Sequence, residues 1–377
     1  MIKLHKLCII GLITLTITVC LSINVNAEEL SNNDFYESVI TKLTENLDDE
    51  TIEILESLGF KDYTPDEISE LSLKETIIQF FSIFSENFSE PFEFLCVSSV
   101  IIIFCSMSGG ILSSENKSGK YFEYVSMIFL SLISFSKIID MITKTVSVIK
   151  IVCFIMKLLL PVLTAIIAFS GKPALALSSG TVSLYISEII IAVCNDILTP
   201  LLCVFAAVSV CGSTNGYINI SPVINLVKKV FAIILGFLGT LYSGVLTIRD
   251  VVAAGTDKIA VKGIKFVLGS AVPIVGSTIS EGLSAVVSAL SLFRNTFGIL
   301  GIIVCIILVA PVFARIILWI FSLMISEYVA VSFGKEAVSQ VFSSIRYVIT
   351  MLLTLLVFMI FVFLISVSSI LITGGLK

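Results

Sequence analysis

The chain contains a single histidine, His5, in 377 residues. Because His5 lies within an N-terminal segment that has the pattern of an export signal, the rest of the chain has no imidazole for proton transfer or metal binding. The P-loop, the HExxH zinc motif and the GxSxG nucleophile motif are also absent from the sequence. These absences argue against an ATP-driven pump or a metalloprotease formed by this chain alone.

Charge is scarce as well. Charged residues make up 14% of the chain and hydrophobic residues 57%, and the mean hydropathy is +1.09. From Phe94 to the end, the sequence is apolar with only short polar breaks. One crossing takes about 20 apolar residues, so this part has room for roughly six to nine membrane-spanning helices. The composition predicts an all-α, polytopic membrane protein.

The first 27 residues read as a signal peptide. Lys3 and Lys6 form a basic start, an apolar stretch follows, and Val25-Asn26-Ala27 precedes Glu28. This pattern predicts cleavage before Glu28, which would deliver the following segment across the membrane. The alternative is an uncleaved anchor, which also leaves that segment outside the cytoplasm.

The charge balance changes sharply at residue 93. Between Glu28 and Glu93, 18 Asp and Glu oppose three Lys, whereas 18 Lys and Arg oppose ten Asp and Glu between Phe94 and Lys377. The acidic segment 28–93 is repelled by anionic headgroups and is poorly suited to nucleic acid. Its charge suits an extracytoplasmic domain that faces another protein, or one that is simply solvated.

Segment 28–93 is expected to be helical, because apolar residues recur at helical spacing from Phe35 to Leu58. Thr64-Pro65-Asp66-Glu67 then supplies the N-cap, first-turn proline and capping-box glutamate of another helix. We expect residues 73–90, which carry several phenylalanines, to lie along the outer membrane interface. The alternative is a small helical hairpin with its own core.

The polytopic domain, 94–377, contains six clear candidate crossings. They are residues 94–112, 122–142, 148–169, 230–248, 297–321 and 347–373. Two further stretches are ambiguous: 174–211 is interrupted by polar residues and a proline, and 264–292 is rich in Gly and Ser.

The distribution of Lys and Arg favours about seven crossings. If 174–211 crosses once and 266–292 dips in and returns, nine Lys and Arg fall inside and six outside. With nine crossings the distribution becomes seven inside and eight outside. Both arrangements place the N-terminal segment outside and the C-terminus in the cytoplasm.

Polar residues within the apolar stretches are the candidate functional positions, because a charge in hydrocarbon usually faces a partner or a cavity. The candidates are Lys157, Glu188, Asn195, Asp196, Glu281 and Arg315. Asn195-Asp196, followed by Pro200, predicts a broken helix with freed carbonyls, as in many transporters. The alternative is a structural kink that a neighbouring helix closes.

The stretch 269–292 is rich in small residues that allow close helix packing. Pro273 and Gly276 are candidates for the turn of a re-entrant hairpin. The seven cysteines after the signal segment form no CxxC pair, and we interpret them as small apolar packing residues. The sequence therefore predicts no metal site and no cofactor.

Three runs carry a more specific signal: ISPVINLVKKVFAIILGFLGTLYSGVLTIRD, GIKFVLGSAVPIVGSTISEGLSAV and FGILGIIVCIILVAPVFARIILWI. These runs, and the order of signal peptide, acidic helical segment and polytopic domain, resemble the stage III sporulation protein AE family. The resemblance covers essentially the whole chain. It is most specific between Ser221 and Trp319, above all at residues 271–276 and at Arg249-Asp250. None of these is a catalytic motif.

The resemblance implies a role in endospore formation. Members of this family sit in the mother-cell membrane around the engulfed forespore, within a multi-protein, secretion-like channel that supports forespore development and late gene expression. The expected partners are other stage III sporulation channel proteins and the lipid bilayer. The basic stretch 249–265 is a candidate contact for a cytoplasmic ATPase partner.

The sequence leaves three classes of function open. The first is a non-enzymatic component of that channel, which predicts dependence on partner proteins. The second is a self-sufficient secondary transporter of a small solute, motivated by the predicted break at Asn195–Pro200, by Glu188 and Glu281, and by a faint repeat between 180–183 and 277–280. The third, an intramembrane enzyme, is disfavoured by the missing histidine and the lack of a paired-aspartate motif.

Overall fold

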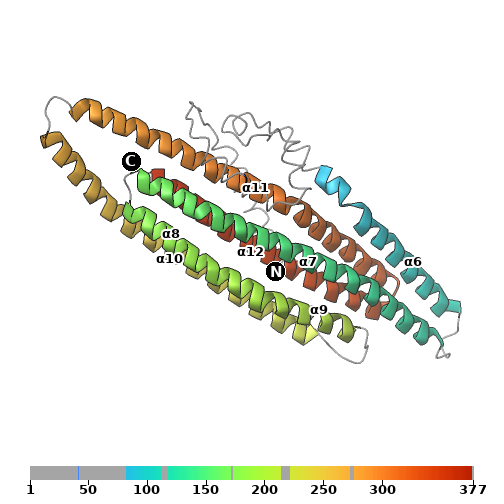
Figure 1. Cartoon of the computed structure of the whole chain (residues 1–377). Helices are drawn as coiled ribbons and strands as arrows, with labels where there is room; N and C mark the ends of the chain where they lie inside the picture. Colours follow the sequence, from blue (N-terminus) through green and yellow to red (C-terminus); the bar gives the residue numbers. More distant parts are fainter. Residues whose placement is uncertain are drawn as a thin grey trace.

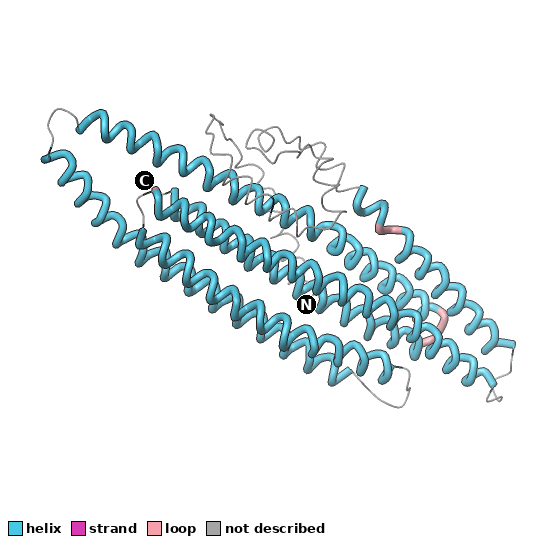
Figure 2. Tube along the Cα trace, in the orientation of Figure 1, coloured by secondary structure: helices cyan, strands magenta, loops and turns pink. Residues whose placement is uncertain are grey.

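The computed structural model describes Thr41 and residues 82–111, 118–170, 173–213, 221–271 and 276–375 (Figures 1 and 2). Every regular element in these segments is a helix, so the all-α prediction is confirmed. The predicted signal peptide, 1–27, and the acidic segment up to residue 81, Thr41 excepted, lie outside the described residues. The predicted domain boundary at residue 93 falls inside the first long helix.

The helices form an elongated bundle (Figure 1). They are α6 (Ser89–Ile111), α7 (Ser118–Phe169), α8 (Pro173–Ala192), the π-helical segment η1 (Val193–Leu198), α9 (Thr199–Ser213), α10 (Ser221–Ala271), α11 (Gly276–Ser332) and α12 (Glu336–Gly375).

Within the described residues, six helical stretches are long and apolar enough to cross a membrane. They are Ser82–Met107, Tyr124–Phe169, Tyr185–Ser209, Pro222–Ile248, Phe297–Ser332 and Glu336–Leu371. The third stretch runs through α8, η1 and α9 without interruption. The chain is therefore a multi-pass membrane protein, and the count is close to the seven crossings expected from the sequence.

One predicted pair of crossings is a single helix. Residues 122–142 and 148–169 both lie in α7, which has no break between them. The intervening segment contains neither glycine nor proline, so nothing in it forces the backbone out of a helix. Its polar groups are satisfied within the helix: Lys144 pairs with Asp140, and Thr145 Oγ1 donates to the Met141 carbonyl at 2.7 Å. The short polar interval is thus a polar patch on a helix, not a turn.

The core of the bundle is the hairpin of α11 and α12, against which α7 packs along its length (Figure 1). At one end, the Phe94 ring of α6 lies 5.0 Å from Trp319 of α11 and 6.3 Å from Phe342 of α12, measured between ring centroids. Ser98 and Ser326 share a hydrogen bond of 2.8 Å between α6 and α11. Such aromatic packing and hydroxyl pairs are the interactions that hold helices together in lipid, where apolar burial alone gives no driving force.

The turn between α11 and α12 requires a glycine. Gly334 has φ +69°, a left-handed conformation that glycine adopts without steric cost. The Gly334 N–H donates to the Val331 carbonyl at 2.9 Å and the Lys335 N–H donates to the Ala330 carbonyl at 2.9 Å, the pattern of a Schellman cap. This cap ends α11 and turns the chain directly into α12.

Two glycines bring the long helices into close contact. A Cβ atom on Gly301 of α11 would clash with the Leu159 side chain of α7, and a Cβ on Gly298 would lie 2.6 Å from Leu371 Cδ2 of α12. The absence of a side chain at these two positions sets the distance between the three central helices.

The bundle is longer than a membrane is thick. At about 1.5 Å per residue, the 51 residues of α10 and the 57 of α11 each extend roughly 75–85 Å, whereas a bilayer is about 40–45 Å thick with its headgroups. The candidate spans of these helices cover only 222–248 and 297–332. Figure 1 shows the connected ends of α10 and α11 extending past the C-terminal end of α12.

Candidate functional site

Five charged side chains join α6, α7 and α11 within the candidate spans. Lys137 Nζ donates a short hydrogen bond to Glu90 Oε1, and Arg315 lies 3.7 Å from Glu90 and 3.8 Å from Asp140. Lys144 completes the group through a 3.1 Å ion pair with Asp140, one turn away on α7. We call these five residues the central ion network.

The central ion network lies deep in the bundle with respect to a membrane. Arg315 stands midway along the 36-residue span Phe297–Ser332. A hydrocarbon layer takes about 20 residues of a helix, so a layer centred on this span contains Arg315 near its middle. Its side chain is 25% exposed. A charge at that depth is costly, and pairing with carboxylates on two other helices is the usual way to offset the cost.

A second ion pair joins α7 to α8. Lys157 Nζ donates to Glu188 Oε1 at 2.9 Å, and both side chains are largely exposed on the outside of the bundle. Leu159, two residues along α7, packs against Gly301 near the start of the α11 span. This pair therefore lies near one edge of a hydrocarbon layer centred on α11. The structure brings together two of the residues that the sequence singled out separately.

The predicted helix break at Asn195–Pro200 is a π-helical segment instead. η1 continues α8 into α9 without unwinding. Both the backbone N–H of Thr199 and its Oγ1 donate to the Cys194 carbonyl, the latter at 2.9 Å. Pro200 has no backbone N–H to donate to a carbonyl of the preceding turn. The wider π-helical turn keeps the backbone helical here, where the sequence predicted freed carbonyls.

Within η1, the two candidate polar residues differ. Asp196 is exposed, whereas the Asn195 Oδ1 atom is buried, and no described residue donates a hydrogen bond to it. Segments of π-helix often occur at functional sites. This buried amide oxygen has the capacity to accept a further hydrogen bond.

The remaining candidates are only partly described. Gly276 is the first residue of α11, and α10 ends at Ala271, so Pro273 falls between the two helices and outside the described residues. Glu281 lies in α11, where the structure describes the backbone alone. The re-entrant hairpin remains a prediction. Arg294, just before the α11 span, is 3% exposed, and its burial lowers the pKa of the guanidinium from its ordinary value.

A third charged group, which the sequence reading missed, lies near the other edge of the layer. Arg346 of α12 forms a 2.8 Å ion pair with Glu327 of α11. Lys228 of α10 lies over the ring of Tyr347, with Nζ 2.7 Å from the ring centroid. Charged pairs thus occur at three levels of the bundle: near each edge and near the middle. For the central ion network, the sequence did carry a signal: Lys137, Asp140 and Lys144 are three and four residues apart and therefore share one helix face.

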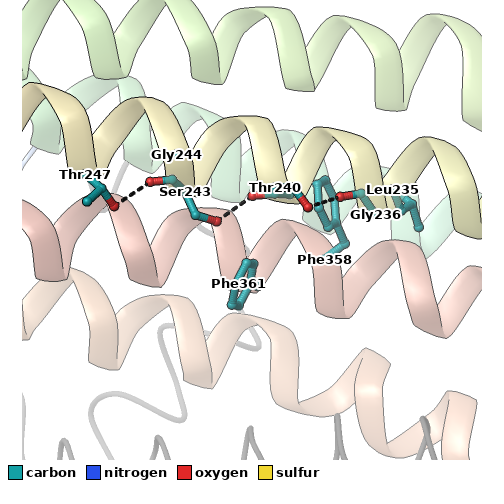
Figure 3. Close-up of a pocket in the computed structure, with 9 residues that line it drawn as sticks. Leu235, Gly236, Thr240, Ser243, Gly244, Thr247, Phe358 and Phe361 are labelled. Carbon is teal, nitrogen blue, oxygen red and sulfur yellow. Dashed lines mark hydrogen bonds between the residues drawn. The ribbon is translucent and has the colours of Figure 1, made fainter.

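An open groove of about 630 Å³ runs between α10 and α12 (Figure 3). Small residues of α10 form its floor, and Phe358 and Phe361 of α12 form one side. The hydroxyls of Thr240, Ser243 and Thr247 each donate to a carbonyl of their own helix, at 2.8, 2.5 and 2.8 Å. The groove therefore presents a smooth and largely apolar surface. No charged residue lines it.

Within the described segments, no three His, Cys, Asp or Glu side chains lie close enough to bind a metal ion together. Cys105, Cys153, Cys194 and Cys305 are buried and free of disulfides. The arrangement is thus one of ion pairs and helix contacts that tie a bundle together.

The family model described as stage III sporulation protein AE matches residues 60–374. The chain belongs to the stage III sporulation protein AE family. This match includes α6–α12 and every charged group described above, which connects the membrane bundle to sporulation.

A curated relative in Bacillus subtilis (strain 168), named stage III sporulation protein AE, is 28% identical over 198 residues. The match covers 52% of this chain and 49% of the relative, so the chain spans about half the length of the curated relative that it matches. No solved structure matches the chain.

Proposed function

We propose that the chain is a non-enzymatic membrane component of the channel that links the mother cell to the forespore, required for endospore development and late forespore gene expression. The observation that carries this proposal is the family match over residues 60–374. Its place is the mother-cell membrane around the forespore. The acidic N-terminal segment is extracytoplasmic in this proposal; the C-terminus is on the same side if each of the six candidate spans crosses once, and cytoplasmic if seven segments cross.

The geometry of the bundle supports a structural role. Arg315 pairs with carboxylates on α6 and α7, and Arg346 pairs with Glu327 between α12 and α11. These contacts hold helices together, and they pair the Arg315 and Arg346 charges with carboxylates of the chain itself. The groove between α10 and α12 has no charged lining. A component of this kind acts through its partners, which we propose to be other stage III sporulation proteins in the membrane and the intermembrane space, with a cytoplasmic ATPase as a further candidate.

The partner proposal is tested in sporulating cells. A tagged full-length chain is cross-linked after engulfment, purified, and its cross-linked proteins are identified. The proposal predicts that other stage III sporulation proteins are recovered from sporulating cells, and not from vegetative cells that express the same tagged chain. Recovery of no such protein, with the tagged chain still able to support sporulation, would contradict it.

A self-sufficient secondary transporter is the second candidate, favoured by the unpaired Asn195 Oδ1 in η1 and by the nearby α7–α8 ion pair. It predicts that the purified chain in liposomes moves a small solute without any other protein. It also predicts that Asn195→Ala or Glu188→Gln abolishes that flux while the amount of folded protein is unchanged. Absence of flux for every solute class tested, together with normal sporulation of both variants, would remove this candidate.

A further inference from the structure

Two cations converge on one aromatic ring at the interface of α10 and α12. Lys228 Nζ lies 2.7 Å from the centroid of the Tyr347 ring, and the Arg346 guanidinium carbon lies 5.0 Å from the same centroid. Lys229 follows on α10 and is exposed. A ring can attract one cation, but it does not cancel the repulsion between two.

The carboxylates nearby neutralise only part of this charge. Glu327 accepts hydrogen bonds from Arg346, with Oε2 2.8 Å from one terminal nitrogen and 2.9 Å from Nε. None of the salt bridges among the described residues gives Lys228 a carboxylate partner. Glu336 stands ten residues before Arg346 on α12, about 15 Å along the helix axis. Lys228 and Arg346 therefore share one close carboxylate, and the site has a net charge of about +1 at neutral pH, to which the adjacent Lys229 adds a further positive charge.

This site lies at the edge of the hydrocarbon layer. A layer of about 20 residues, centred on the 36-residue spans of α11 and α12, leaves about eight residues at each end in the headgroup region. Glu327 is near the end of the α11 span, and Arg346 and Lys228 are within the first third of theirs. Lysine and arginine side chains reach several ångströms toward the headgroups, and tyrosine is enriched at the same depth.

The surface beside the site is apolar in the way an acyl chain requires. The open groove between α10 and α12 begins at Leu235, Gly236 and Gly239, about 10–17 Å along α10 from Lys228 and on the same side of that helix. This groove lies toward the middle of the layer from Lys228. A ligand that is anionic at the headgroup level and apolar below it would satisfy both the unbalanced cations and the apolar groove.

We propose that Lys228, Arg346 and Tyr347 bind the phosphate of an anionic phospholipid, with one acyl chain in the groove between α10 and α12. The Lys228 ammonium and the Arg346 guanidinium donate hydrogen bonds to phosphate oxygens, and Lys229 adds attraction from the rim. Basic pockets between membrane helices recognise acidic headgroups in this way. Glu327 competes with the phosphate for Arg346, so this carboxylate sets the affinity.

The test uses the full-length chain, purified in a neutral detergent and stripped of lipid. Phosphatidylglycerol, phosphatidylcholine or soluble glycerol 3-phosphate is titrated into the sample, and binding is followed by native mass spectrometry and by the melting temperature. The proposal predicts saturable binding and a raised melting temperature with phosphatidylglycerol alone. If phosphatidylcholine binds and raises the melting temperature equally, the surface is a nonspecific lipid surface. If glycerol 3-phosphate does so equally, the site is one for free phosphate. Either result would overturn the proposal.

Two variants shift the affinity in opposite directions. Lys228→Gln removes one interfacial cation and is expected to weaken phosphatidylglycerol binding about fivefold. Glu327→Gln removes the competing carboxylate and is expected to tighten it. Lys150→Gln, an exposed lysine on α7 away from the site, is the matched control and leaves binding unchanged. Circular dichroism and size-exclusion chromatography establish that each variant is folded. Equal affinities of wild type and Lys228→Gln for phosphatidylglycerol would overturn the proposal.

Discussion

The Arg315 guanidinium of α11 lies 3.7 Å from the Glu90 carboxylate of α6. Glu90 is the second residue of α6, the most N-terminal long helix of the described bundle, and Arg315 stands midway along the candidate span Phe297–Ser332 of α11. Pro91, next to Glu90, accepts a 2.7 Å hydrogen bond from Ser322 Oγ through its carbonyl. Ionic and hydroxyl contacts thus attach α6 to α11 at the same place.

The central ion network predicts non-additive effects on stability. Arg315→Gln leaves Glu90 without one of its two cations, and Glu90→Gln leaves Arg315 with Asp140 alone. We expect each single variant to lower the free energy of unfolding, and the double variant to differ from their sum by about 0.5–3 kcal/mol, the range for residues in direct contact. Unfolding of the full chain in detergent, followed by circular dichroism, measures these values. Additive effects would show that the two side chains do not interact.

Lys144→Gln provides the comparison for that experiment. Its ion pair with Asp140 is an exposed contact within one helix, between side chains that are each 47% exposed. Because this pair joins no second helix, the variant should lower the free energy of unfolding less than Arg315→Gln does. A loss as large as that of Arg315→Gln would mean that the helix surface, not the contact between helices, determines stability.

The α7–α8 ion pair predicts rescue by charge exchange. Lys157→Glu places two carboxylates opposite each other and should reduce the amount of chain in the membrane, whereas Lys157→Glu combined with Glu188→Lys should restore it. Immunoblots of membrane fractions and spore counts report the two outcomes. Failure of the exchanged pair to recover either quantity would show that Glu188 has a role that its ion pair with Lys157 does not explain.

The contact between α7 and α11 predicts a steric effect at one glycine. Gly301→Ala introduces a methyl group into the Leu159 side chain, and overpacking of this kind costs about 1–3 kcal/mol. Gly236→Ala is the matched control, since nothing lies within 4 Å of its Cβ position, and replacing glycine within a helix favours folding by up to about 1 kcal/mol. The melting temperature should fall for the first variant and stay level or rise for the second. The reverse order would contradict the packing of α7 against α11.

The continuous α7 predicts that residues 143–147 never reach water. A Ser147→Cys variant, in a background without native cysteines, should resist a membrane-impermeant maleimide, whereas Lys335→Cys in the α11–α12 turn should react.

Six crossings place the two termini on the same side of the membrane, and seven place them on opposite sides. Ready labelling at position 147 would restore two separate crossings and the opposite placement of the termini.

Sequence patterns identified the class of fold and several of the charged positions. Lys157, Glu188 and Arg315 stood out because each interrupts a long apolar run. The pairing of Arg315 with Glu90 was missed for a definite reason: Glu90 precedes the apolar run and was grouped with the acidic segment 28–93. A boundary drawn from charge alone divides a helix whose first turn carries the ion pair.

Local breaks were harder to predict than helices. Asn195, Asp196 and Pro200 indicated an unwound segment, yet the structure accommodates the proline by a π-helical turn, since the Thr199 backbone N–H and hydroxyl both donate to the Cys194 carbonyl. The polar interval of α7 indicated a turn, but its side chains pair within the helix. Both outcomes depend on hydrogen bonds and ion pairs that form only when the backbone stays helical.

The most direct test of the proposed function is deletion of the gene in its spore-forming host, followed by fluorescence imaging of sporangia after engulfment with a late forespore reporter. The account predicts forespores that engulf normally and then shrink and lose late transcription, and a wild-type copy that restores both. Normal forespore size, reporter signal and spore yield in the deletion strain would contradict it.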